Sequence, residues 1–251
     1  RVGDRCHLYY WGIGSDGLRR ICRAEARADR PGEWRGTGSV LEPQPDTEYN
    51  CGGPSFPFVV PREDAPWLMY FGAWGRPRDD GKLANRTGIA LSRDAGATWN
   101  YHSESPILPL DRPWDCEGTG SVCVVRLDDE YRMYYTALGE YRPKPPGTRT
   151  AHGDVTPWIG VGYAVSQDGV QWTKPVDDLL IPPRGLDAEP YEYICSKPFV
   201  MREAGGWRMW VSSIGVAYRI RSLTSVDGLD WHWTPSPPDG ELGIGPPGSF
   251  D

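Results

Sequence analysis

Carboxylate side chains recur at four comparable places in this sequence, each just before a segment with the composition of a β-strand. They lie in Asp46-Thr-Glu-Tyr-Asn-Cys-Gly-Gly-Pro54, Pro113-Trp-Asp-Cys-Glu-Gly-Thr-Gly120, Asp187-Ala-Glu-Pro-Tyr-Glu-Tyr-Ile194 and Ser249-Phe-Asp251. Two carboxyl groups can carry acid–base chemistry, in which one with a raised pKa protonates a leaving oxygen and the other activates water or attacks carbon. The candidate catalytic residues are Glu117, Asp115, Asp46 and Glu192, and the candidate ligand-binding carboxylates are Asp187 and Asp251.

A repeated phrase indicates the elements that would position these carboxylates. Ser166-Gln-Asp-Gly-Val-Gln-Trp172 returns as Ser225-Val-Asp-Gly-Leu-Asp-Trp231 and, one residue longer, as Ser92-Arg-Asp-Ala-Gly-Ala-Thr-Trp99, and an eroded copy ends at Trp34. Each Asp can accept hydrogen bonds from turn amides and each Gly accepts a positive φ, so the phrase is typical of a β-hairpin turn. Recurrence at intervals of 59 to 73 residues indicates stacked supersecondary units.

The strand-like segments fall into four repeats, the first of which lacks its opening strand. The expected strands are Cys6–Gly12 and Leu18–Ala26; Gly53–Val60, Trp67–Gly72 and Thr87–Leu91; Gly120–Arg126, Tyr131–Thr136 and Ile159–Val165; and Ser196–Met201, Trp207–Val211 and Tyr218–Thr224, with return strands from Trp99, Trp172 and Trp231. No helical periodicity is present. Four-stranded repeats of this length predict an all-β fold, a β-propeller with antiparallel blades.

The number of blades is less directly indicated than the fold. Pro246–Asp251 reads as the lead-in to a further blade, and an unfinished blade would leave an unpaired edge. We therefore expect five blades with the first and last incomplete, and four blades closing the ring is the alternative. Residues 1–251 are expected to form a single propeller domain.

In such a meander, the carboxylate segments share one face with the loops between second and third strands. Those loops are Trp74–Arg86 and Gly139–Thr156, and irregular loops on one rim of a rigid scaffold commonly carry function. The further candidate ligand-binding residues on this face are Tyr49, Asn50, Trp74, Arg76, His152 and Tyr193. Arginines there can clamp a carboxylate or phosphate, and aromatic rings can stack on a ligand ring, with packing as the alternative role.

These features together resemble a known family. The Ser-x-Asp-Gly-x-x-Trp hairpins, the Met-Tyr-Tyr, Met-Tyr-Phe and Met-Trp second strands, and Glu117-Gly118 are similar to the five-bladed propeller glycoside hydrolases, the clan of β-xylosidases, arabinanases, invertases and levansucrases. The resemblance implies a catalytic Asp in the first blade, an orienting Asp in the second and a Glu acid in the third. Glu117 matches the acid, the second position falls near Asn50 with Asp46 as the nearest carboxylate, and the first lies before Arg1.

The chemistry expected from the resemblance is cleavage of a glycosidic bond. Two carboxyl groups about 6.5–9.5 Å apart would invert the anomeric configuration, and two about 5–5.5 Å apart would retain it. The sequence therefore predicts a glycoside hydrolase or transglycosylase acting on a carbohydrate or glycosylated small molecule. Asn50, where a carboxylate is expected, leaves open a diverged propeller that binds glycans or reshapes a small cyclic substrate. The Asp-box spacing of Ser92–Trp99 makes a sialidase-like enzyme a lower alternative.

Composition limits the partners. A net charge of −7 without a basic patch argues against nucleic acid and anionic membrane, and no apolar run approaches the roughly 20 residues of a membrane span. The six cysteines include no C-x-x-C pair and no metal spacing, so no metal and no cofactor is expected. They favour a reduced, cytoplasmic protein, although an even count permits disulfides and the start at Arg1 leaves localisation undetermined. The oligomeric state is not indicated.

Overall fold

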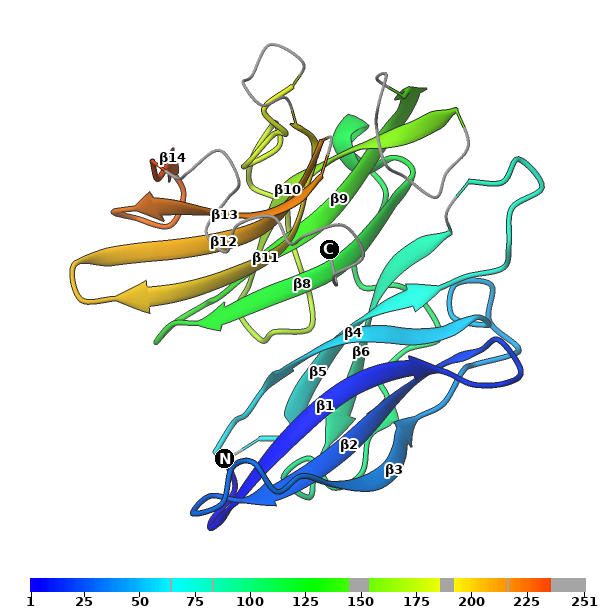
Figure 1. The fold of residues 1–251 in the computed structure, drawn as a ribbon, viewed down its shortest axis with the longest axis vertical. Coiled ribbons are helices and arrows are strands. Elements are labelled where there is room, and N and C mark those ends of the chain that lie inside the picture. Colours follow the sequence, from blue (N-terminus) through cyan, green and yellow to red (C-terminus); the bar gives the residue numbers. More distant parts are fainter. Residues whose placement is uncertain (64, 83, 145–153, 186–191, 216, 236–251) are drawn as a thin grey trace. The chain divides into compact units, whose positions relative to one another are not determined.

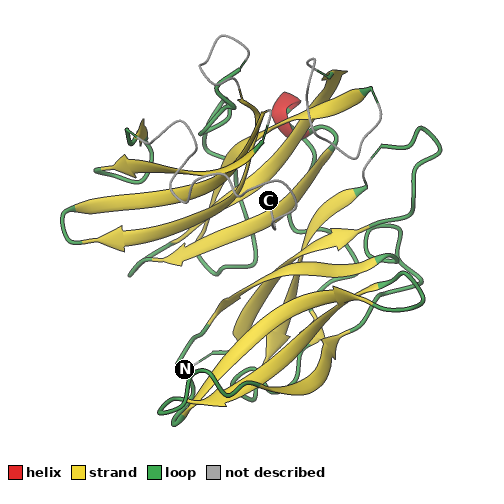
Figure 2. Cartoon of the chain, in the orientation of Figure 1, coloured by secondary structure: helices red, strands yellow, loops and turns green. Residues whose placement is uncertain are grey.

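The chain consists of two compact units, Arg1–Pro109 and Leu110–Asp251, here called the N-terminal and C-terminal units. The computed structural model describes residues 1–63, 65–82, 84–144, 154–185, 192–215 and 217–235. Figure 2 shows that these residues are almost entirely strands and loops, with one helical turn. The prediction of an all-β chain is confirmed.

The N-terminal unit holds two antiparallel sheets (Figure 1). The first contains β1 (Arg5–Ile13), β2 (Arg19–Arg27) and β3 (Arg35–Leu41). The second contains β4 (Gly53–Val60), β5 (Trp67–Trp74), β6 (Asn85–Ser92) and β7 (Asn100–Tyr101). The strands of each sheet follow one another in sequence order, which is the meander that the repeats predict.

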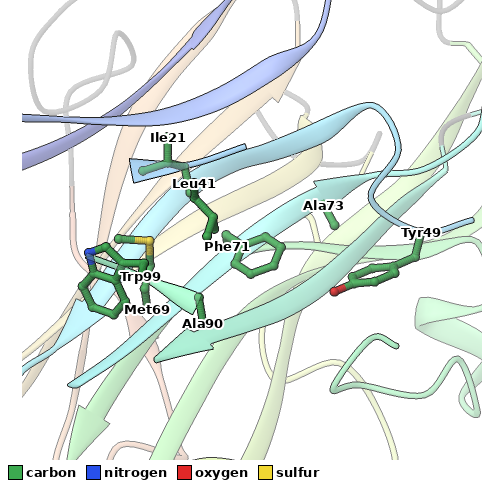
Figure 3. Packing of buried hydrophobic residues seen from close by; sticks show 8 residues of the cluster. All are labelled: Ile21, Leu41, Tyr49, Met69, Phe71, Ala73, Ala90 and Trp99. Carbon is green, nitrogen blue, oxygen red and sulfur yellow. The ribbon is translucent and has the colours of Figure 1, made fainter. Parts of the chain in front are cut away.

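The core of this unit lies where the two sheets face each other, because β4 packs on β1 and β2. Figure 3 shows the side chains that fill it, among them Ile21 of β2 and Phe71 of β5. Trp99, the residue that closes the hairpin phrase, is buried there and meets Tyr9 edge-to-face at 5.8 Å between ring centroids. Aromatic pairs in this geometry contribute beyond the area they bury, so the repeated tryptophan has a packing role.

The C-terminal unit contains one seven-stranded sheet, ordered β14-β13-β12-β11-β10-β9-β8. Its strands are β8 (Gly118–Arg126), β9 (Tyr131–Pro143), β10 (Val155–Ser166), β11 (Glu192–Glu203), β12 (Gly206–Gly215), β13 (Tyr218–Ser225) and β14 (His232–Trp233), and a 3-10 turn, η1 (Pro113–Asp115), precedes β8. Two antiparallel meanders, β8 to β10 and β11 to β14, are joined by one parallel pairing of Ile159 with Ile194. They are the third and fourth repeats.

The two meanders also pack face to face, and β8 lies beside β11 (Figure 1). The buried Cys123 of β8 fixes this contact, since its Sγ lies 3.2 Å from the amide of Val200 in β11 and 3.6 Å from that residue's carbonyl oxygen. Burial raises the pKa of the Cys123 thiol to about 12. The side chain is therefore an inert, neutral part of the core.

Two details of the third repeat differ from the prediction. The expected loop Gly139–Thr156 is shorter, because the hairpin of β9 and β10 continues to the pair Pro143–Val155. The expected return strand after Trp172 is reduced to isolated bridges, Val165 with Thr173 and Val161 with Ile181. Pro175, Pro182 and Pro183 in this segment supply no amide for a continuous ladder, which explains its absence.

The hairpin phrases form the turns that the sequence predicts. In the third repeat, the Ser166 hydroxyl accepts from the amides of Asp168 and Gly169, and Asp168 Oδ1 accepts from the amides of residues 170 and 171. The fourth repeat reproduces every one of these bonds around Ser225 and Asp227. Backbone amides of Asp230 and Leu229 lower the pKa of Asp227 to about 2, so this carboxylate is ionised at neutral pH.

In each unit, a tyrosine hydroxyl of one repeat donates a hydrogen bond to the backbone of the turn glycine of the next repeat. The Tyr9 hydroxyl donates to the carbonyl oxygen of Gly96 at 2.8 Å, and the Tyr134 hydroxyl donates to that of Gly228 at 2.9 Å. Both glycines have positive φ, 84° and 80°. The position therefore needs glycine for backbone conformation and for the approach of the neighbouring repeat.

Gly96→Ala is expected to lower the free energy of unfolding by about 2 kcal/mol or more, because it adds a steric clash to the usual strain of a positive φ. An added Cβ would lie 2.0 Å from the Tyr9 hydroxyl. Gly17→Ala is the matched control, since Gly17 has φ 77° with nothing within 4 Å of an added Cβ. Urea unfolding of both variants measures the difference, and equal losses would show that the contact with Tyr9 adds nothing.

No helix among the described residues is long and apolar enough to cross a membrane.

Candidate functional site

Two of the candidate carboxylates, Glu117 and Glu192, lie at the starts of strands β8 and β11 of the C-terminal unit. A row of backbone pairs crosses the sheet from Gly118 through Leu138 and Ile159 to Ile194. Glu117 directly precedes Gly118, and Glu192 lies two residues before Ile194. The register therefore places both glutamates at the same end of one sheet.

Glu117 lies between the η1 turn and β8, and its side chain is partly exposed. Its backbone amide donates to the carbonyl oxygen of Leu138 at 3.0 Å, which fixes the backbone at the first pairing position of β8. The neighbouring Cys116 is exposed. Partial desolvation of the thiol by its neighbours and, next, the negative charge of Glu117 raise the pKa of Cys116, so this cysteine is not an activated nucleophile.

Asp115 is fully buried and its carboxylate is held on several sides. Its Oδ2 accepts from Lys174 Nζ at 2.6 Å and from the Tyr135 hydroxyl at 2.8 Å, and its Oδ1 accepts from the amide of Arg112 at 3.2 Å. A buried carboxylate with three donors is well satisfied. This geometry gives Asp115 a role in fixing the η1 turn, two residues before Glu117.

Lys174, which follows the third hairpin phrase, bridges two carboxylates. Its buried Nζ also donates to Asp111 Oδ1 at 2.8 Å, and this bond is the main cause of the lowered pKa of Asp111. Burial, and next the charge of Asp115, raise the pKa of the Tyr135 hydroxyl far above its ordinary value. Tyr135 is therefore a neutral donor to Asp115, and the cluster ties two distant segments together.

Glu192, the first residue of β11, is buried beside two arginines. Its Oε1 accepts from Arg221 Nε at 2.9 Å, and Arg184 Nη1 lies 3.8 Å from its Oε2. That Oε2 has no hydrogen-bond partner among the described residues, although buried carboxylate oxygens are normally paired. Burial and then the charge of Glu192 raise the pKa of the buried Cys195 thiol. The neighbouring Tyr193 is buried as well.

In the N-terminal unit, the residues near the expected orienting carboxylate are structural. Asn50 is buried and its Nδ2 donates to Gln44 Oε1 and to the Tyr101 hydroxyl, both at 3.0 Å. Tyr49 belongs to the core and its hydroxyl donates to Gln44 Oε1 and to the carbonyl oxygen of Ser103. Asp46 is exposed. A carboxylate could not replace Asn50 here without losing both donated bonds.

Trp74 and Arg76 lie at the end of β5 and in the loop that follows. The Trp74 indole donates to Ser55 Oγ at 2.8 Å, and the Arg19 guanidinium lies 3.9 Å from its ring centroid, so one face of the ring is already covered. Arg76 is exposed and its Nε contacts the Glu48 carboxylate at 3.2 Å. The predicted ligand-binding residues His152, Asp187 and Asp251 lie outside the described residues.

Sequence reasoning missed three residues of the C-terminal cluster, namely Lys174, Arg184 and Arg221. Arg221 lies within the expected strand Tyr218–Thr224, in a run of three consecutive buried residues, 221–223, so its place in the strand gave no signal that its side chain would be buried. A buried arginine requires an acid. Within the described part of the chain, no group of three or more His, Cys, Asp or Glu is placed to hold a metal ion, and all six cysteines are free.

Comparison with known proteins gives uncharacterised relatives. No protein-family profile matches the chain. The chain is 33% identical over 202 residues to "Uncharacterized protein Rv1502" of Mycobacterium tuberculosis strain H37Rv, in an alignment that covers 76% of this chain and 58% of that protein. The "Uncharacterized protein MT1551" of strain CDC 1551 gives the same values. The chain thus spans less than two thirds of the length of these relatives.

Solved structures with a similar fold are glycoside hydrolases. One described as "Glycoside hydrolase" has a TM-score of 0.70 at 18% identity, covering 93% of this chain and 70% of its own. A thermostable family-43 glycoside hydrolase has a TM-score of 0.64 at 17% identity, covering 95% and 71%. Zg3597, a family 117 glycoside hydrolase produced by the marine bacterium Zobellia galactanivorans, has a TM-score of 0.68 at 12% identity, and the match covers 92% of this chain and 66% of that one. The predicted β-propeller fold is confirmed, and these likenesses concern the fold.

Proposed function

We propose that this protein is a propeller glycosidase that cleaves a glycosidic bond in a carbohydrate or a glycosylated small molecule, with Glu117 as the general acid. The observation that carries the proposal is the position of Glu117, which is partly exposed immediately before β8 on a backbone fixed by Leu138. The glycoside hydrolases of similar fold support the reaction class. A partly buried carboxyl group can keep its proton near neutral pH and pass it to the leaving oxygen.

The second carboxylate in this proposal is Glu192. Arg221 holds its Oε1, and its Oε2 has no hydrogen-bond partner in the described part of the chain. A carboxyl group kept in place by an arginine is proposed to activate water, attack the anomeric carbon or orient another acid.

Asp115 has a supporting role in the proposed mechanism. Its carboxylate is engaged by Lys174 and Tyr135, so it would hold the η1 turn in place while Glu117 transfers the proton. The two acids differ in their surroundings, because the carboxylate of Asp115 is buried and occupied by its hydrogen-bond donors, whereas the partly exposed side chain of Glu117 can reach a substrate. Asp46 is exposed in the N-terminal unit, and no role in this mechanism is proposed for it.

A second candidate function is a propeller that binds glycans without cleaving them. The observation that favours it is the buried amide of Asn50, bonded to Gln44 and Tyr101, at the position where the resemblance implies an orienting Asp. Binding a glycan without cleaving it does not require an orienting carboxylate at this position.

A panel of aryl glycosides separates the two functions. We expect the full-length protein to release the aryl alcohol from at least one glycoside, with a sugar product whose anomeric configuration NMR can assign. The spacing of the acting carboxylates then follows from retention or inversion. Saturable glycoside binding without any release of product, measured by calorimetry on the same panel, would instead support the binding protein.

A further inference from the structure

A cavity of about 450 Å³ in the N-terminal unit is lined by arginines. It lies between the segment that precedes β4 and the loop from β5 to β6, and its charged lining residues are Glu48, Arg76, Arg78 and Arg86. Three guanidinium groups thus face one carboxylate in a protein whose net charge is −7. A local excess of positive charge attracts anions.

Backbone bonds make the walls of the cavity rigid. The amide of Arg76 donates to the carbonyl oxygen of Glu48 at 2.9 Å, and the amide of Gly75 donates to that of Ala84 at 2.8 Å. A Cβ at Gly75 would lie 2.7 Å from the carbonyl oxygen of Glu48, so only glycine lets the two segments approach this closely. The arginines therefore project from a fixed frame, which lowers the entropy lost on binding.

Two of the three arginines of the cavity, Arg76 and Arg78, form exposed or partly exposed ion pairs that an anionic ligand can replace. Arg76 Nε shares the two oxygens of Glu48 at 3.2 and 3.3 Å, with side chains 64% and 81% exposed. Arg78 makes two bonds with the partly exposed Asp80. Exposed ion pairs contribute little to stability, so replacing them by a ligand's carboxylate or phosphate has a low cost. Guanidinium groups bind both kinds of anion through paired N–H bonds.

We propose that this cavity binds an anionic group of the ligand, a carboxylate or a phosphate carried by a sugar, through Arg76, Arg78 and Arg86. Tyr49 supplies an uncharged wall, because burial raises the pKa of its hydroxyl to about 12. Glu48 is the one charged group of the lining that repels the anion, and it limits affinity. The sugar nature of the ligand rests on the proposed function, whereas anion binding at this site does not.

Matched ligands test the inference on the full-length protein. Calorimetry measures the affinity for glucuronate, which carries a carboxylate, for glucose 6-phosphate, which carries a phosphate, and for neutral glucose. We expect Arg76→Gln to weaken binding of at least one anionic ligand by about tenfold, the order expected for a charge-assisted hydrogen bond. We expect Glu48→Gln to strengthen it several-fold, because the repelling charge is removed. Raising the salt concentration should weaken binding of the anionic ligand.

Arg27→Gln is the control variant, since Arg27 also forms an exposed ion pair, with Asp29, away from the cavity. The anion affinity of this variant should equal that of the wild type. Equal affinity of the wild-type protein for charged and neutral ligands, or unchanged anion affinity in Arg76→Gln, would overturn the inference. Glycoside turnover is measured separately. Turnover without anion discrimination would refute the cavity's role alone, and anion discrimination without turnover would refute only the proposed hydrolysis.

Discussion

Replacing Glu117 with Gln is expected to lower kcat for glycosides with poor leaving groups by about 10²–10⁴-fold, the usual contribution of a positioned general acid. The amide keeps the size of the side chain and its place before β8 but has no proton of suitable acidity to give. The backbone bond from residue 117 to Leu138 does not depend on the side chain, so the fold should remain. Steady-state kinetics on a nitrophenyl and an alkyl glycoside of the same sugar measure the effect.

The leaving group makes this prediction specific to acid catalysis. A nitrophenolate leaves without protonation, so the variant should keep more of its activity on the nitrophenyl glycoside than on the alkyl glycoside. The acidic limb of the bell-shaped pH profile belongs to the base and should persist, whereas the alkaline limb belongs to the acid and should flatten. A uniform loss on both substrates would point to a binding or structural role for Glu117.

Glu140→Gln is the matched control for charge. Glu140 is exposed near the same end of the sheet, close enough to influence the pKa of Cys116 as Glu117 does. Its replacement removes the same charge from the same region without touching the position before β8. We expect its kinetics to stay within about twofold of the wild type, in keeping with the small effects of surface substitutions. A comparable loss in both variants would show that net charge, and not the acid, matters.

Local hydrogen bonds explain which features could be predicted from the sequence. Ser166, Asp168 and Gly169 bond to one another and to amides within a few residues, so the phrase carries nearly all the information for its turn. The strands between turns follow from their composition, and their predicted positions overlap the strands of the structure. The return strand after Trp172 is reduced to isolated bridges, and the hairpin of β9 and β10 and the strands β11 and β12 extend further than predicted. These extensions depend on pairing between strands, which no segment encodes alone.

Long-range partners explain what could not be predicted. Lys174 donates to Asp111 and Asp115, which lie 63 and 59 residues away in the sequence. Its local sequence therefore does not distinguish it from a solvent-exposed lysine after a turn. Asn50 donates a hydrogen bond to Tyr101, 51 residues away. The sequence shows only that position 50 holds Asn where the resemblance implies an Asp, and it does not reveal this partner. The candidate carboxylates could be identified from their repeated position, whereas the cations that hold Asp115 and Glu192 required coordinates. The catalytic roles and the single propeller domain stay predictions.

The largest expected change in stability is that of Lys174→Met. The Lys174 side chain is 3% exposed and Asp115 is fully buried, so their pairing at 2.6 Å lies in a medium of low polarity. Methionine fills similar volume but leaves the Asp115 charge with only the Tyr135 hydroxyl and the Arg112 amide. Breaking a buried pair by removing one partner typically costs about 3–5 kcal/mol, and we expect a loss of that size in the free energy of unfolding measured by urea titration.

Two further variants separate the buried charge from simple packing. Arg27→Met breaks an ion pair whose two side chains are 57% and 61% exposed, and pairs of that kind contribute about 0–1 kcal/mol. Adding Asp115→Asn to Lys174→Met removes the unpaired charge, so the double variant should be more stable than the sum of the single losses predicts. Strict additivity would mean that the two residues stabilise the fold independently. Since Asp115 lies two residues before Glu117, the double variant should also recover stability without full activity, because a neutral amide holds the η1 turn less firmly than the ion pair does.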